Sequence, residues 1–166
     1  MRALWLSILL AGTVAAQGRH FGDPMPAAEP SSSGREMLAA HNAVRKRAGT
    51  APLIWSDRLA ERSRDWAETL VAKGQFAHRP NGKYGENLFE ISGANATSAE
   101  VVSEWASESV NYDYASNRCH GVCGHYTQIV WRGTREVGCG VARGGGREVW
   151  ACNYDPPGNW VGERPF

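Results

Sequence analysis

Five histidines and four cysteines are the side chains of this sequence best suited to chemistry. His41 falls on the apolar face of a predicted helix, where a histidine is more often a hydrogen-bonded core residue than a ligand. His20 stands in a proline- and serine-rich stretch and His120 between two cysteines, so we expect both to be solvated. His78 precedes the loop-forming sequence Arg-Pro-Asn-Gly and is expected to be accessible, which leaves it and His125 as the candidate functional histidines.

A glutamate on an apolar helix face is the second chemical signal. A helix is predicted to follow Ser98 and to run to about Tyr112, and Val101, Trp105 and Glu108 then share one narrow inward stripe. A carboxylate among such neighbours needs a hydrogen-bond partner or access to solvent. Glu108 is therefore a candidate site residue on periodicity alone.

The cysteines are expected to form disulfides. An even number in an exported chain favours a disulfide framework, and four cysteines allow three pairings. The alternative is a zinc site with four thiolates, but the spacing does not match a zinc ribbon. Cys139 and Cys152 flank a predicted hairpin, while Cys119 and Cys123 would close a very small loop, so we predict the pairs 119–123 and 139–152.

A nucleophilic enzyme has weaker support. The chain contains no G-x-S-x-G segment, and its cysteines are expected to be oxidised. Serines occur at 103, 107 and 109 on the predicted third helix, but Ser107 and Ser109 lie off its inward stripe. The residues alone mark no serine as a nucleophile.

The N-terminus is typical of an export signal. Met1-Arg2 is followed by an apolar run to Gly12 and then by small residues up to Ala16, so residues 1–16 are predicted to be a signal peptide cleaved after Ala16. The alternative is an uncleaved anchor, although the run is short of the ~20 residues that span a bilayer. No other segment is apolar enough to cross a membrane, so the mature protein is expected to be secreted or periplasmic.

Composition excludes nucleic acid as a partner. Cleavage removes Arg2, so that 17 of the 18 basic residues remain against 17 acidic ones. No basic stripe or polybasic patch remains for nucleic acid or anionic lipid. Residues 17–34, rich in proline, serine and glycine, are predicted to be a flexible linker, and residues 35–166 to be one domain.

Periodicity places the elements of that domain. Helices are predicted from 35 to 47, with Ser33 or Gly34 at the start, and from Ser56 as N-cap to Gly74. In the second helix one stripe contains Leu59, Ser63, Trp66 and Leu70, with Ala60 and Ala67 beside it. A strand is expected over 84–91. Two further strands, 138–143 and 148–154, would form a hairpin around three consecutive glycines. The sequence thus predicts an α+β fold.

Two segments near the C-terminus carry a family resemblance. Gly-His-Tyr-Thr-Gln-Ile-Val-Trp at 124–131 and Cys-Asn-Tyr-Asp-Pro-Pro-Gly-Asn-Trp at 152–160 are joined by Gly138-Cys139-Gly140. Together they resemble the two signature motifs of the CAP superfamily, which contains cysteine-rich secretory, antigen-five and pathogenesis-related group 1 proteins. The resemblance covers residue 36 to the C-terminus. It implies a three-layer α-β-α sandwich with a central, mainly antiparallel sheet, and a short helix near His125.

The resemblance also implies a metal cleft. In the family, two histidines and two glutamates meet in one cleft, and the matching positions here are His78, Glu86, Glu108 and His125. Such a set suits a divalent metal, with zinc favoured, and only two neutral ligands would bind it directly, so binding is expected to be weak. The glutamates would orient the metal-bound water.

For function, the resemblance favours a monomeric, non-enzymatic binding module for a small lipid, a sterol or an extracellular partner. One alternative is a metal-dependent hydrolase or protease with Glu108 or Glu86 as its base. Another is a structural or defence-related extracellular protein with a vestigial cleft. The family's sterol binding is attributed to an aromatic loop, whereas residues 92–98 here are small and polar. Plant relatives have six cysteines, so one of their crosslinks is missing.

Overall fold

The structure is a computed structural model and describes residues 30–166. The predicted signal peptide, most of the predicted linker and His20 lie outside the described residues. The helices and strands are α1 (Ser32–Ala48), β1 (Ile54–Trp55), α2 (Asp57–Lys73), β2 (Gly85–Ser92), α3 (Ser98–Ser107), a 3-10 turn (Glu108–Asn111), β3 (Tyr112–Asp113), β4 (Arg118–Cys119), α4 (Gly124–Ile129), β5 (Glu136–Gly144) and β6 (Arg147–Asp155).

The central sheet is mainly antiparallel, as predicted. Its strand order is β1-β5-β6-β2; β6 runs antiparallel to both neighbours, and only the short β1 is parallel to β5. The β5–β6 hairpin turns at Gly145 and Gly146, whose φ angles of 59° and 75° belong to a conformation that glycine adopts without steric cost. This register places Cys139 opposite Cys152.

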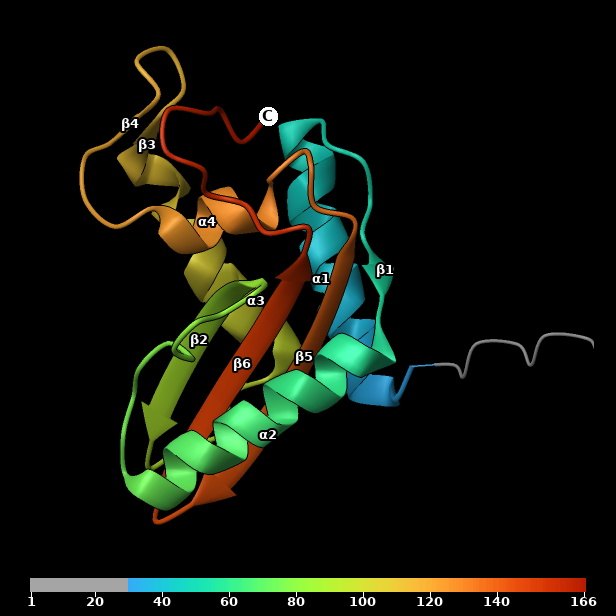
Figure 1. The fold of residues 1–166 in the computed structure, drawn as a ribbon, viewed down its shortest axis with the longest axis vertical. Helices are drawn as coiled ribbons and strands as arrows, with labels where there is room; N and C mark the ends of the chain where they lie inside the picture. The colour runs from blue at the N-terminus through green and yellow to red at the C-terminus, as the bar shows by residue number, and fades with distance from the viewer. Residues whose placement is uncertain (1–29) are drawn as a thin grey trace, which may run out of the picture.

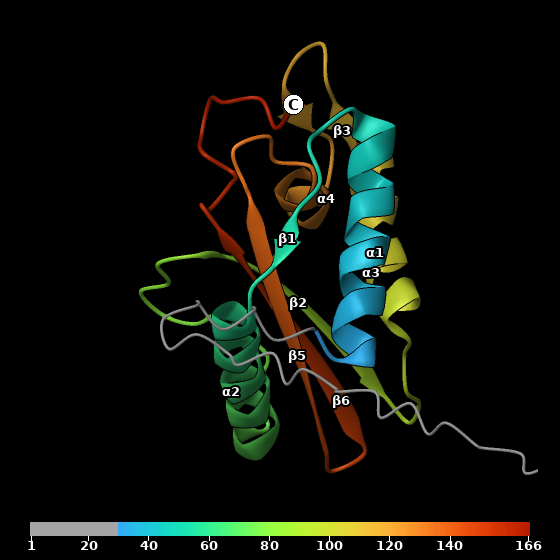
Figure 2. The same ribbon diagram turned by 90° about the vertical axis from the view of Figure 1, so that its right-hand side faces the viewer.

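The helices cover both faces of the sheet and complete the three-layer sandwich (Figures 1 and 2). Helix α2 lies alone on one face, over a core that includes Leu70, Leu88 and Val149. Helices α1 and α3 lie on the other face, where the core contains Trp105 and Trp150 among other residues. Neighbouring residues of a strand therefore point to opposite faces of the sheet and pack in different cores.

Glycines on β5 bring α2 unusually close to the sheet. A Cβ at Gly138 would lie 2.2 Å from the backbone nitrogen of Ala60, and the Ser63 hydroxyl donates a 2.8 Å hydrogen bond to the Gly138 carbonyl. Of the predicted stripe, Leu59, Ser63 and Leu70 are fully buried, whereas Trp66 is partly buried and packs against the core. Ala67, predicted beside the stripe, is fully buried as well. Only small side chains fit where two backbones approach so closely.

The helix ends differ from the predicted ones by a few residues. Helix α1 begins at Ser32, three residues early, because the Ser31 hydroxyl accepts a hydrogen bond from the Gly34 N–H at 3.1 Å. Residues 32–34 are therefore helical. Thr97 rather than Ser98 caps α3, in a capping box with Glu100, and α3 tightens into a 3-10 turn at Glu108. Ser56 precedes α2 but makes no side-chain cap.

Two buried polar residues of α1 connect the layers. His41 is a core residue, as expected, because its side chain is fully buried and bonded at both ring nitrogens. Arg45 donates to the carbonyls of Ile129 at 2.7 Å and Trp131 at 2.9 Å, which fixes the end of α4 against α1. Within residues 30–166, no helix has the length and apolar character needed to cross a membrane.

Candidate functional site

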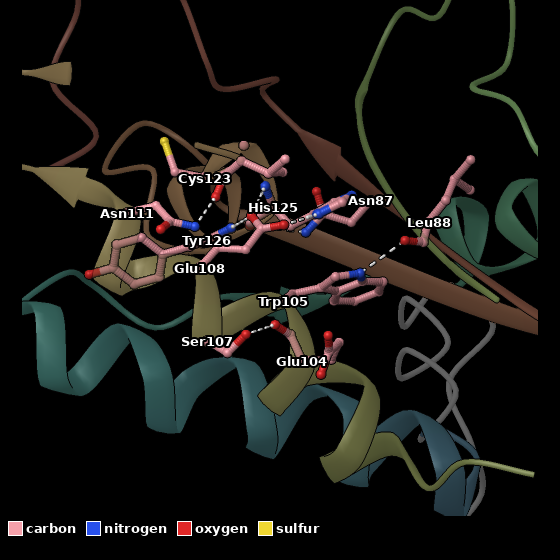
Figure 3. Close-up of polar contacts among 12 residues, drawn as sticks. Asn87, Leu88, Glu104, Trp105, Ser107, Glu108, Asn111, Cys123, His125 and Tyr126 are labelled. Carbon is pink, nitrogen blue, oxygen red and sulfur yellow. Dashed lines mark hydrogen bonds and ion pairs between the residues drawn. The ribbon is translucent and has the colours of Figure 1, made fainter. Parts of the chain in front are cut away.

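His125 and Glu108 form one half of the candidate site (Figure 3). One carboxylate oxygen of Glu108 lies 2.6 Å from Nδ1 of His125, and the other accepts the backbone N–H groups of His125 at 2.9 Å and Tyr126 at 3.3 Å. Glu108 therefore caps the start of α4, where Cys123 makes no side-chain cap. Since a carboxylate only accepts, the neutral imidazole carries its proton on Nδ1, which leaves the lone pair on Nε2.

The surrounding elements hold this pair in place. The Trp105 ring stacks on the His125 ring, with centroids 6.1 Å apart and planes 26° apart, and its Nε1–H donates to the Leu88 carbonyl at 3.0 Å. The Asn87 amide donates to the carbonyl of His125 at 3.1 Å. Strand β2, helix α3 and helix α4 thus fix one imidazole, whose side chain is 29% exposed.

His78 and Glu86 form the other half. Nδ1 of His78 lies 2.9 Å from a Glu86 oxygen that also accepts the Arg79 backbone N–H at 3.0 Å. The second Glu86 oxygen is 3.4 Å from the amide nitrogen of Asn153, its partner across β2 and β6. The His78 side chain is 65% exposed, as expected for a loop histidine. The hydrogen bond to Glu86 raises the pKa of His78, against a smaller opposing effect of burial.

The structure therefore pairs each predicted histidine with one predicted glutamate, His78 with Glu86 and His125 with Glu108. A cavity of about 250 Å³ lies beside His78 and Glu86, and neither Glu108 nor His125 lines it. Within residues 30–166, the one set of three metal-type ligand atoms within 4.8 Å of one another belongs to His41, Cys139 and Cys152. Both of those cysteines are in a disulfide. Coordination of one ion by both pairs stays a prediction.

Strand β2 links the two pairs through adjacent residues. Glu86 and Leu88 lie two residues apart and point to the same face of the sheet, the face covered by α2, where Leu88 packs in the core. Asn87 points the other way and reaches α4. One end of β2 therefore contributes to each pair.

The disulfides join the predicted cysteines. Cys119 is bonded to Cys123, and Cys139 to Cys152 across the β5–β6 hairpin. His120, inside the smaller loop, is exposed. Ser107 donates its hydroxyl hydrogen bond to the Glu104 carbonyl, and no serine in the described part of the chain bonds to His78 or His125.

Sequence reasoning missed three side chains of the cavity: Arg62, Arg79 and Asn153. Arg79 follows His78 directly, and Asn153 lies inside the second signature segment, so both could have been noticed by position. Arg62 gave no such signal, because a charged residue on the polar side of a helix is ordinarily solvated.

Known proteins resemble this chain over most of its length. Residues 38–154 match the model of the cysteine-rich secretory protein family. Pathogenesis-related protein 1 of Arabidopsis thaliana is 43% identical over 135 residues, covering 81% of this chain and 83% of the relative. Pathogenesis-related protein 1A of Nicotiana tabacum is 45% identical over 138 residues, covering 81% and 82%.

A solved structure agrees with this assignment. Venom allergen-like protein 4 of Schistosoma mansoni superposes with a TM-score of 0.66 at 29% identity, covering 82% of this chain and 95% of that one. The signature segments, the α-β-α sandwich and these matches together show that the chain belongs to the cysteine-rich secretory protein (CAP) family, among relatives of the pathogenesis-related 1 type.

Proposed function

We propose that this protein is an extracellular, defence-related binding module in which His78 and His125 hold a divalent metal through their Nε2 atoms. The observation that carries the proposal is the shared arrangement of the two histidines. Each imidazole donates its Nδ1–H to a glutamate that is itself held by backbone N–H groups. Metal-binding histidines in proteins donate the N–H that does not face the metal to a carboxylate, a backbone carbonyl or water, and a carboxylate is the partner of both histidines here.

The donor set fits zinc. Two neutral imidazole nitrogens are good ligands for this ion, whereas calcium and magnesium prefer oxygen. Waters would fill the remaining positions, so the affinity is modest and the ion exchanges readily. When bound, zinc would supply a polarised water, and Glu86 and Glu108 would keep both imidazoles in the right tautomer.

The hydrogen bonds of the two glutamates favour binding over hydrolysis. Glu108 already accepts three N–H groups, and Glu86 accepts two at one oxygen and an amide at the other. Carboxylates committed in this way position other groups, whereas a general base must reach the proton of its substrate or water. We therefore propose that the protein binds a ligand, either a small lipid or an extracellular partner, and does not hydrolyse a substrate.

Zinc titration by calorimetry tests the metal site. The double variant His78→Ala with His125→Ala should lose zinc binding and keep its fold, because Glu108 retains its two backbone donors. The exposed His120→Ala variant is the matched control and should bind like the wild type. Affinity should fall as protons compete for imidazole, and because the Glu86 hydrogen bond raises the pKa of His78, the fall should begin above pH ~6.5. Undiminished zinc binding in the double variant would place the metal elsewhere.

A further inference from the structure

Two arginines without acidic partners line the cavity beside His78. Arg62 comes from α2 and Arg79 from the following loop. Among residues 30–166, the arginines that pair with a carboxylate within 4.0 Å are Arg58, Arg143 and Arg147. Arg79 makes one side-chain hydrogen bond, from Nη2 to the Arg62 carbonyl at 2.9 Å. The cavity thus holds two positive charges that no carboxylate of the described chain neutralises by direct contact.

Three residues that line this cavity each have a buried polar side-chain atom that lacks a hydrogen-bond partner. These atoms are Nε of Arg62, Nε of Arg79 and Oδ1 of Asn153, and they are all the buried side-chain atoms without a partner within residues 30–166. Buried polar groups of folded proteins are nearly always satisfied. Two donors and one acceptor left over on three residues that line one cavity favour a ligand that accepts from the arginines and donates to the amide oxygen.

The orientation of the Asn153 amide is fixed by its neighbours. Its nitrogen lies 3.4 Å from both the Gly85 carbonyl and a Glu86 oxygen, each of which only accepts. The reversed amide would place its oxygen against these two acceptors, so the assignment with Oδ1 left over is the favourable one.

The local charge also favours an anion. The like charges of Arg62 and Arg79 line the same cavity, so the two guanidinium groups repel each other. Lys83 and Arg62 both lie over the Tyr84 ring, 5.4 Å from its centroid. Glu86 is the one carboxylate lining the cavity, and its oxygens are already engaged by His78, the Arg79 N–H and Asn153. An incoming anion would relieve the repulsion between the arginines.

We propose that this cavity binds an oxyanion that carries a hydrogen-bond donor next to its charge, as hydrogen phosphate and α-hydroxycarboxylates do. Arg62 and Arg79 bind the anionic oxygens, and Oδ1 of Asn153 accepts the O–H. Planar guanidinium groups suit both phosphate and carboxylate geometry. The site shares the wall formed by His78 and Glu86 with the proposed metal site, but it requires no metal.

Titration in metal-free buffer, followed by NMR of the arginine Nε–H and asparagine amide signals, tests the site directly. Four probes form two matched pairs: hydrogen phosphate against sulfate, and glycolate against acetate, the first of each pair having the donor. We expect saturable shifts of the Arg62 and Arg79 Nε–H signals, with a several-fold lower Kd for the member that has the donor. The pair that binds more tightly shows whether the natural group is a phosphate or a carboxylate.

Arg62→Gln is the decisive variant, because this side chain donates no hydrogen bond to the protein and its loss should leave the fold intact. It should weaken anion binding by about tenfold, which corresponds to ~1.4 kcal/mol. Arg64→Gln removes the same charge from an exposed position two residues away and should have no effect. Equal weakening in both variants, equal affinity for the two members of each pair, or no saturable shift would overturn the proposal.

Discussion

The burial of His41 should make the stability of this domain depend on pH between about 4 and 6.5. Its side chain is fully buried, Nδ1 donates to the Met37 carbonyl at 2.8 Å, and Nε2 accepts from the Tyr154 hydroxyl at 2.8 Å. A proton on Nε2 would remove that acceptor and place a charge in the core near Arg45. Burial therefore lowers the pKa of His41 from 6.5 to about 4, with Arg45 adding to the effect and the Met37 bond opposing it.

The sign and size follow from proton linkage. The unfolded chain binds a proton at this residue below pH ~6.5, while the folded chain does so only near pH 4, so acid favours unfolding. At pH 5 the unfolded imidazole is almost fully protonated and the folded one almost not. With ~1.36 kcal/mol per pKa unit, the free energy of unfolding should fall by about 2 kcal/mol between pH 7.5 and pH 5.

Urea unfolding followed by tryptophan fluorescence can measure this loss at pH 7.5, 6.5 and 5.0. We compare the wild type with His41→Gln, which cannot titrate, and with His120→Gln, which removes an exposed histidine. His41→Gln should be less stable at pH 7.5 but should lose much less on acidification, whereas His120→Gln should follow the wild type. The raised pKa of His78 stabilises the fold at low pH, but all three proteins contain His78, so its contribution cancels when their pH slopes are compared. A His41→Gln protein with the wild-type pH slope would show that His41 does not cause the loss of stability in acid.

Two further substitutions test the packing and the chemistry. Gly140→Ala should destabilise the protein by ~1–3 kcal/mol in thermal unfolding, because the new Cβ would lie 2.4–2.7 Å from atoms of Arg64, two of them backbone atoms. The control Gly133→Ala, whose Cβ would have no neighbour nearer than 3.5 Å, should change stability little. Equal effects of the two substitutions would argue against close packing of α2 on β5. Glu108→Gln should weaken zinc binding by ~10-fold or more through the loss of the His125 orienter, and wild-type protein should show no turnover of ester or peptide substrates. Reproducible wild-type turnover that falls ~100-fold in Glu108→Gln, under inhibitors of trace proteases, would instead identify a hydrolase.

Local patterns predicted the elements well and their contacts less well. Helix α2 ends at Gly74, whose φ of 62° is the left-handed conformation expected of a glycine C-cap, and this could be read from the chain directly. The full burial of Ala67 and the partial burial of Trp66 could not, because they depend on packing against β5 and β6, more than seventy residues further along the chain. A helical stripe gives the direction of burial but not the distance to the opposing layer.

The candidate site shows a similar division. Periodicity alone singled out Glu108, and the structure supplies the partners that an inward carboxylate requires, three N–H donors at the start of α4. The pairing of His78 with Glu86 came only from the family resemblance. Neither periodicity nor the family resemblance could identify the two cavity arginines. Their Nε atoms lack hydrogen-bond partners, and which groups surround a side chain is decided by the tertiary structure.

The arrangement of β2 makes the metal and anion proposals separable. Its alternation sends Glu86 toward His78 and the arginine cavity, and Asn87 toward His125, so each histidine has its own anchors. Loss of His125 should therefore abolish shared metal binding while the cavity keeps both arginines and Asn153. Loss of Arg62 removes one anion ligand without touching either imidazole–glutamate pair. Because the two proposals depend on different side chains, a negative result for metal binding would not count against anion binding, and a negative result for anion binding would not count against the metal site.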